Sequence, residues 1–119
     1  MIIKEDKLQN VFSLFVEIEP HKNFNKLENE FEEFQSLITS ADLVIVDKLL
    51  HKQKSPVINT FISKGKLEEI KNIIKDQDID LLIINHQLSA SQNRNLEIFF
   101  NVRVIDCLLY TSDAADDAW

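Results

Sequence analysis

FISKGKLEEI (Phe61–Ile70) and LSASQNRNLE (Leu88–Glu97) each have the pattern of a helix start. In the first segment, the apolar residues of Lys66–Lys75 recur at three- and four-residue spacing, which places them on one helical face. In the second, Ser89 and Gln92 have the spacing of a capping box, in which two side chains satisfy backbone N–H groups of the first turn. Both segments therefore predict an amphipathic helix with a defined amino-terminal end.

Strand-like apolar runs separate these helices. They are Val11–Ile18 (VFSLFVEI), Leu43–Val46 (LVIV), Leu81–Ile84 (LLII) and Val102–Ile105 (VRVI). The continuous apolar runs LVIV and LLII are typical of strands that are buried in a sheet. A further amphipathic helix is predicted over Lys26–Ala41, between the first two runs. Strands that alternate with helices of this size favour βαβ units. We therefore predict an α/β fold, a small, open and mostly parallel sheet with helices on both faces.

The element boundaries follow from turn and capping residues. Asn25 and Glu28 have the spacing of an N-cap and its partner, so the first helix is predicted to begin there. Lys48–Asn59 is the longest polar segment and contains the helix breaker Pro56, so it is predicted to be a connection. A short strand is predicted within Val57–Ile62.

Composition indicates a single domain. The chain has 119 residues, of which 45% are hydrophobic and 28% charged, as in an ordinary globular protein. Its single cysteine excludes an internal disulfide framework. No apolar run is long enough to span a bilayer and the first residues lack a signal-peptide core, so we expect a cytoplasmic protein. The net charge of −7 argues against binding of nucleic acid by bulk charge, but it permits a local basic site.

Residues Cys107–Trp119 (CLLYTSDAADDAW) differ from the rest of the chain, because they contain its only Cys, Tyr and Trp. The codons TGT-CTC-TTA-TAC-ACA-TCT-GAC-GCT-GCC-GAC translate to CLLYTSDAAD, which resembles a transposon-derived sequencing adapter. We therefore predict a domain over residues 1–106 and a translated adapter tail over residues 107–119. The alternative is a natural acidic tail.

One glycine is too few for the common nucleotide-binding loops. A Walker A loop needs two glycines and a dinucleotide fingerprint needs three, because the backbone must approach phosphate closely. The chain contains only Gly65. The histidines His21, His51 and His86 lack the spacing of metal ligands, and His86 is interpreted as a polar loop residue. We predict no catalytic residue and no metal site.

The candidate binding residues for RNA or phosphate are Lys64, Gly65, Lys66 and Arg94. The first three lie at a predicted helix N-terminus, where free N–H groups and the helix dipole favour anions. Arg94 lies on the following helix and could contact phosphate as well. The alternative interpretation is an ordinary helix entry with solvated lysines and an exposed helix arginine.

The two segments and VRVID resemble the N-terminal domain of HflX-type ribosome-associated GTPases. That family has a G-x-G-K-x-E-E-like block, then L-S-P-x-Q-x-R-N-L-E, then V-x-V-I-D-R-T. The matching residues are Gly65, Lys66, Glu68, Glu69, Leu88, Ser89, Gln92, Arg94, Asn95, Leu96, Glu97, Val102, Val104, Ile105 and Asp106. The chain departs at Ser63, where glycine is usual, and at Ala90, where proline is usual. The match ends at Asp106.

The resemblance implies a ribosome-docking domain of a GTPase that binds the large ribosomal subunit through rRNA and splits stalled ribosomes. It also implies that GTP and magnesium would bind in a downstream G domain, so this chain is expected to hold no cofactor and to hydrolyse no GTP. Two other classes remain. One is a stand-alone nucleotide-binding domain or enzyme with a site at Lys64–Lys66. The other is a receiver-like or generic α/β interaction domain, in which Glu17 and Glu19 would imitate the acidic cluster after the first strand and Asp47 the phosphoacceptor after a later one.

Overall fold

The computed structural model describes residues 9–18 and 24–106, so the predicted tail over residues 107–119 lies outside the described residues. Along the chain the elements are β1 (Asn10–Ile18), α1 (Phe24–Thr39), β2 (Val44–Gln53), α2 (Lys64–Asp76), β3 (Leu81–Ile84), α3 (Ala90–Phe100) and β4 (Arg103–Ile105). The strand order is β2-β1-β3-β4, and each neighbouring pair is parallel. The predicted α/β class and parallel sheet are confirmed.

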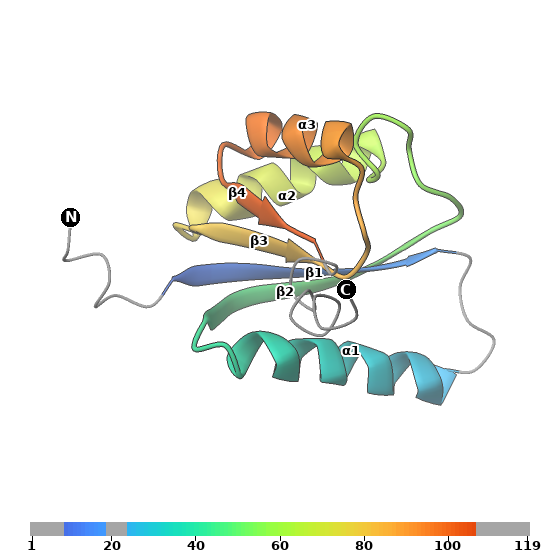
Figure 1. Cartoon of the computed structure of the whole chain (residues 1–119), viewed down its shortest axis with the longest axis vertical. Helices are drawn as coiled ribbons and strands as arrows, with labels where there is room; N and C mark the ends of the chain where they lie inside the picture. The colour runs from blue at the N-terminus through green and yellow to red at the C-terminus, as the bar shows by residue number, and fades with distance from the viewer. Residues whose placement is uncertain (1–8, 19–23, 107–119) are drawn as a thin grey trace, which may run out of the picture.

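The helices cover both faces of this sheet. In Figure 1, α1 lies below the sheet, and α2 and α3 lie above it. From β1 the chain passes through α1 to β2 on one side, and from β2 it passes through α2 to β3 on the other side of β1. At the carboxyl ends of the neighbouring strands β1 and β3, the chain therefore leaves in opposite directions, from β1 toward β2 and from β3 toward β4. Such a place is a topological switch point.

Alternation along β1 divides the core into two clusters, because successive side chains of a strand point to opposite faces. Phe12, Leu14 and Val16 pack with apolar residues of α2 and α3. Val11 and Phe15 pack with residues of α1. Each fully buried large apolar side chain contributes about 1.5–3 kcal/mol to the stability of such a core. Among the described residues, no helix is long and apolar enough to cross a membrane.

Two predictions for the segment between Leu43 and Ile62 are wrong. The strand does not end at Val46 but continues to Gln53, through half of the predicted connection Lys48–Asn59. β2 is an edge strand that pairs with β1 along its full length, so backbone pairing holds it despite its polar residues. The short strand predicted in Val57–Ile62 is a tight turn, with only an isolated antiparallel bridge between Val57 and Phe61.

The predicted helix starts have different outcomes. α1 begins at Phe24, so Asn25 lies inside its first turn and the predicted N-cap is wrong. The capping box of α3 is confirmed: Gln92 N–H donates to Ser89 Oγ and Ser89 N–H donates to Gln92 Oε1, both at 3.0 Å. α2 begins at Lys64, two residues before the predicted Lys66–Lys75 pattern.

Candidate functional site

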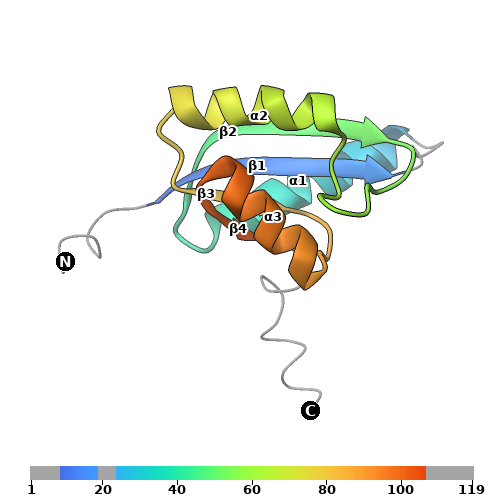
Figure 2. The ribbon, with the colours of Figure 1, turned by 90° about the horizontal axis from the view of Figure 1, so that it is seen from above.

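The candidate residues lie near the starts of α2 and α3. α2 and α3 begin at the same end, near the carboxyl ends of the strands, as the two views in Figures 1 and 2 show. Lys64 and Gly65 are exposed in the first turn of α2, and Lys66 is half-buried beside them. Arg94 is exposed on α3. Arg94 lies in the second turn of α3, so it belongs to a different helix from the two lysines.

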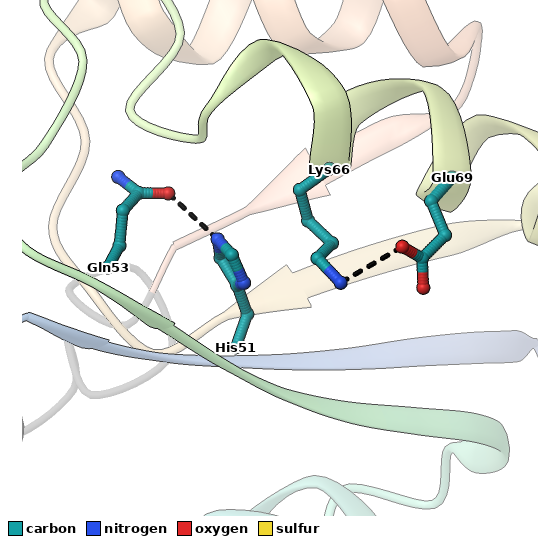
Figure 3. Close-up of polar contacts among 4 residues, drawn as sticks. All are labelled: His51, Gln53, Lys66 and Glu69. Carbon is teal, nitrogen blue, oxygen red and sulfur yellow. Dashed lines mark hydrogen bonds and ion pairs between the residues drawn. The ribbon is translucent and has the colours of Figure 1, made fainter.

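Gln53, the last residue of β2, holds the start of α2. Its Oε1 accepts the backbone N–H of Ser63 at 3.0 Å, and its Nε2 donates to the carbonyls of Ser55 and Phe61, both at 2.8 Å. His51 Nε2 lies 2.9 Å from the same Oε1 (Figure 3). Because an amide oxygen only accepts, His51 donates this bond and carries its proton on Nε2.

One ion pair partly neutralises the positive charge at the start of α2. Lys66 Nζ contacts Glu69 Oε1 at 2.9 Å, and both lie near His51 (Figure 3). Burial lowers the pKa of His51 below its ordinary value of 6.5, and the charge of Lys66 lowers it further. The hydrogen bond to Gln53 and the charge of Glu69 oppose this shift. His51 is therefore neutral at physiological pH, and Lys64 is the lysine of this turn without an ion pair among the described residues.

The backbone at the start of α2 does not require glycine. Ser63 has φ −63° and ψ 151°, an extended conformation open to any residue, so the departure from the family pattern at this position involves no strain. Gly65 has no positive φ, and an added Cβ would meet nothing within 4 Å. The first N–H groups of a helix have no intrahelical partner. This open turn with Lys64 can therefore accept a phosphate oxygen.

In the Leu88–Glu97 segment at the start of α3, the side-chain amides of Gln92 and Asn95 bond to the loop of residues 57–59. Gln92 Nε2 donates to the carbonyls of Val57 and Ile58, both at 3.1 Å. Asn95 Nδ2 donates to the carbonyl of Asn59 at 2.9 Å. This loop leads directly into α2, so hydrogen bonds connect the start of α3 to the segment that precedes α2.

Other polar residues of the motif hold β4. Asn93 Nδ2 donates to the Val104 carbonyl at 3.1 Å, and Glu97 Oε2 accepts the Val104 N–H at 3.0 Å. The buried Asp106 accepts the Leu88 N–H through Oδ2 at 2.9 Å. These structural roles were not predicted from the sequence, although the four-residue spacing of Asn93 and Glu97 places them on one helical face.

His86 has a structural position at the switch point. Its Nε2 contacts the Val16 carbonyl, and its ring packs on Phe61 with centroids 5.0 Å apart. The adjacent Asn85 accepts the Val16 N–H through Oδ1 at 2.7 Å. In the described residues, no group of three or more His, Cys, Asp or Glu could hold a metal ion.

Comparisons with known proteins match this arrangement. A family model described as GTP-binding GTPase N-terminal matches residues 28–108. GTPase HflX of Alkalihalophilus pseudofirmus is 30% identical over 104 residues, which are 87% of this chain and 24% of that protein. GTPase HflX of Escherichia coli is 34% identical over 77 residues, 65% of this chain and 18% of that protein. The chain thus spans less than a quarter of the length of these relatives.

Solved structures agree with the sequence matches. A GTP-binding protein from Sulfolobus solfataricus, crystallised with GDP, superposes with a TM-score of 0.61 and 27% identity. That match covers 85% of this chain and 28% of the archaeal chain. The catalytic domain of an IS607-like serine recombinase, at 11% identity and a TM-score of 0.54, shares the fold alone. With the family model covering more than half of its residues, this chain belongs to the GTP-binding GTPase N-terminal family, the N-terminal domain of HflX-type GTPases.

Proposed function

We propose that this domain docks an HflX-type GTPase on the large ribosomal subunit, with the edge formed by Lys64, Gly65, Lys66 and Arg94 against rRNA. The observation that carries the proposal is the exposure of Arg94 within a motif whose other polar side chains are used by the fold. Gln92, Asn93 and Asn95 are bonded to backbone carbonyls, whereas Arg94 has no such contact among the described residues. A guanidinium left in solvent suits contact with a phosphate backbone.

The distribution of charge favours approach from this side. α2 has four lysines against two glutamates and one aspartate, whereas α1 has four glutamates and one lysine. The acidic α1 face would repel a polyanion, and the α2–α3 edge would attract it locally. A chain with an overall net charge of −7 can therefore still present one side to RNA.

In this proposal, hydrolysis occurs elsewhere in a longer protein. One glycine in the whole sequence leaves no Walker A loop, so GTP and magnesium would bind in a separate G domain. Docking by this domain would contribute to GTP-dependent splitting of stalled ribosomes by such a protein. The domain itself would hydrolyse no GTP.

The test is binding of the purified 119-residue chain to purified large ribosomal subunits across a salt series. Contacts to phosphate release counterions, so we expect weak binding that falls steeply with salt. Lys64→Glu with Arg94→Glu should lower the affinity by about tenfold or more and reduce the salt slope by about two. A matched control is Lys75→Glu with Arg103→Glu, which makes the same change of charge at an exposed lysine in the last turn of α2 and an exposed arginine at the start of β4.

The control should lose much less affinity than the test variant. Equal losses in the two double variants would show only general repulsion and would remove the case for this edge. Absence of binding by the parent chain at low salt would contradict the docking proposal.

A further inference from the structure

An exposed isoleucine lies in the connection between β2 and α2. The side chain of Ile58 is 87% exposed, and that of its neighbour Val57 is 38% exposed. In Figure 1 this green connection passes beside the start of α3. A single exposed apolar side chain is ordinary on a protein surface. Its significance therefore depends on how its backbone is held and on the charges around it.

Hydrogen bonds hold the backbone of Ile58 in one position. Val57 and Phe61 pair through two backbone hydrogen bonds of 3.1 and 2.7 Å, which close a tight turn over residues 57–61. The side-chain amides of Gln92 and Asn95 attach the carbonyls of this turn to α3. The isoleucine side chain is thus presented from a preorganised backbone, which lowers the entropic cost of binding a partner.

The charges around this turn favour an anionic partner. Residues 51–67, from the end of β2 to the first turn of α2, contain no aspartate or glutamate, although the chain has 20 acidic residues among 119. The same segment contains Lys52, Lys54 and Lys64, which are exposed. Among the described residues these three lysines have no ion pair. Cations on both sides of the turn, with no carboxylate between them, attract a polyanion.

We propose that Ile58 packs against an unpaired base of rRNA, while Lys54 and Lys64 contact the phosphates on either side of that base. The inference rests on the proposed docking to the large ribosomal subunit, and it names the kind of nucleotide that is recognised. Stacking covers the faces of bases within a duplex, so a side chain reaches a base face where the nucleotide is unpaired and splayed out. Apolar side chains such as isoleucine pack on bases in this way, and lysines fix the phosphate backbone around them.

The first test is binding of variants of the 119-residue chain to purified large ribosomal subunits across a salt series. Ile58→Ser should lower the affinity by about fivefold to tenfold, because the apolar contact with the base is lost. The salt slope should stay the same, because an apolar contact releases no counterion. Ile58→Leu keeps the apolar contact and should bind within about twofold of the parent.

Val44→Ser is the matched control for the loss of an exposed apolar side chain. Val44 is 39% exposed at the amino end of β2, whereas the turn follows the carboxyl end of that strand. Its replacement should change the affinity by less than about twofold. Circular dichroism verifies that each variant is folded.

A photo-crosslink identifies the class of partner, because a pocket on a ribosomal protein would also accept an isoleucine. Ile58→p-benzoylphenylalanine places a photoreactive group on the turn. Irradiation with large subunits should join the chain to rRNA, in a product that ribonuclease digests, and reverse transcription should stop at an unpaired nucleotide. The same group at Val44 should give no such product.

Three results would overturn the inference. Unchanged affinity of Ile58→Ser, with Lys64→Glu and Arg94→Glu still weakening binding, would remove the base contact and leave the docking proposal standing. A crosslink to a ribosomal protein or to a base-paired nucleotide would assign the isoleucine a different contact. Absence of binding by the parent chain at low salt would remove both proposals.

Discussion

The side-chain oxygen of Gln53 accepts the backbone N–H of Ser63 at 3.0 Å, so the end of β2 fixes the residue before α2. The same amide group also bonds to His51, Ser55 and Phe61. The position of the Lys64–Lys66 turn therefore depends on one glutamine at the end of an edge strand.

Replacing this glutamine should destabilise the domain. Gln53→Ala removes four hydrogen bonds and leaves partly buried partners without their acceptor or donors. We expect the free energy of unfolding to fall by about 1–3 kcal/mol, measured by urea denaturation. Gln87→Ala, at an exposed residue, is the control and should change stability by less than about 0.5 kcal/mol. Equal stability of the two variants would show that the bonds to Gln53 contribute little.

The lowered pKa of His51 predicts a pH-dependent stability. Its pKa in the folded state lies below the ordinary value of 6.5, so the unfolded chain binds a proton more readily. The contribution is therefore fully present above pH 6.5 and is lost as the pH falls from there through the folded-state pKa. His51→Gln removes the titrating group, so the free-energy difference between parent and variant should shift in favour of the variant on acidification.

Unfolding of both proteins at several pH values between 8 and 5 checks this prediction. A constant difference between parent and variant across the range would contradict it. Other groups titrate equally in both proteins, so their contributions cancel in the comparison.

Gly65→Ala separates folding from ligand binding at the start of α2. The added methyl group meets no atom within 4 Å, and alanine is a better helix former than glycine. The variant should therefore be more stable than the parent by up to about 1 kcal/mol. If a phosphate approaches the backbone here, the same methyl group should weaken binding to large ribosomal subunits. Greater stability with unchanged binding would argue against close phosphate contact at Gly65.

Buried polar atoms under α1 offer stabilising substitutions. Ser13 Oγ and both amide atoms of Gln35 are buried without a hydrogen-bond partner among the described residues. Removing an unsatisfied buried group relieves its desolvation cost, so Ser13→Ala and Gln35→Leu should each raise stability by about 1 kcal/mol. Thermal denaturation measures the change, with Ser55→Ala on the surface as a control. A lower melting temperature for Ser13→Ala would show that its hydroxyl has a bonding partner.

Local periodicity predicted the elements that repeat an apolar pattern. LLII and the Lys66–Lys75 face needed no tertiary information, because a strand buried on both faces leaves a continuous apolar run and a half-buried helix leaves a helical period in the sequence. The second half of β2 was missed, because His51 and Gln53 read as polar loop residues while their pairing with β1 is long-range. Asn25 had correct capping chemistry at a position one residue inside the helix, and such boundaries shift easily.

The candidate site was predictable only in part. Lys64, Lys66 and Arg94 lie on elements with visible starts, so the sequence indicated them. Gln53 could not be found in this way, because it acts on Ser63 across ten residues of irregular chain.

The side chains of α3 that hold Val104 also affect how this sheet can meet other sheets. β4 is an edge strand of three residues, and Glu97 and Asn93 already bond to the Val104 N–H and carbonyl. Those are the two backbone groups that an incoming strand would need at the middle of β4. With both occupied, side chains of α3 block strand addition at the middle of β4 without a proline or a bulge. The domain is thereby protected from edge-to-edge aggregation at β4.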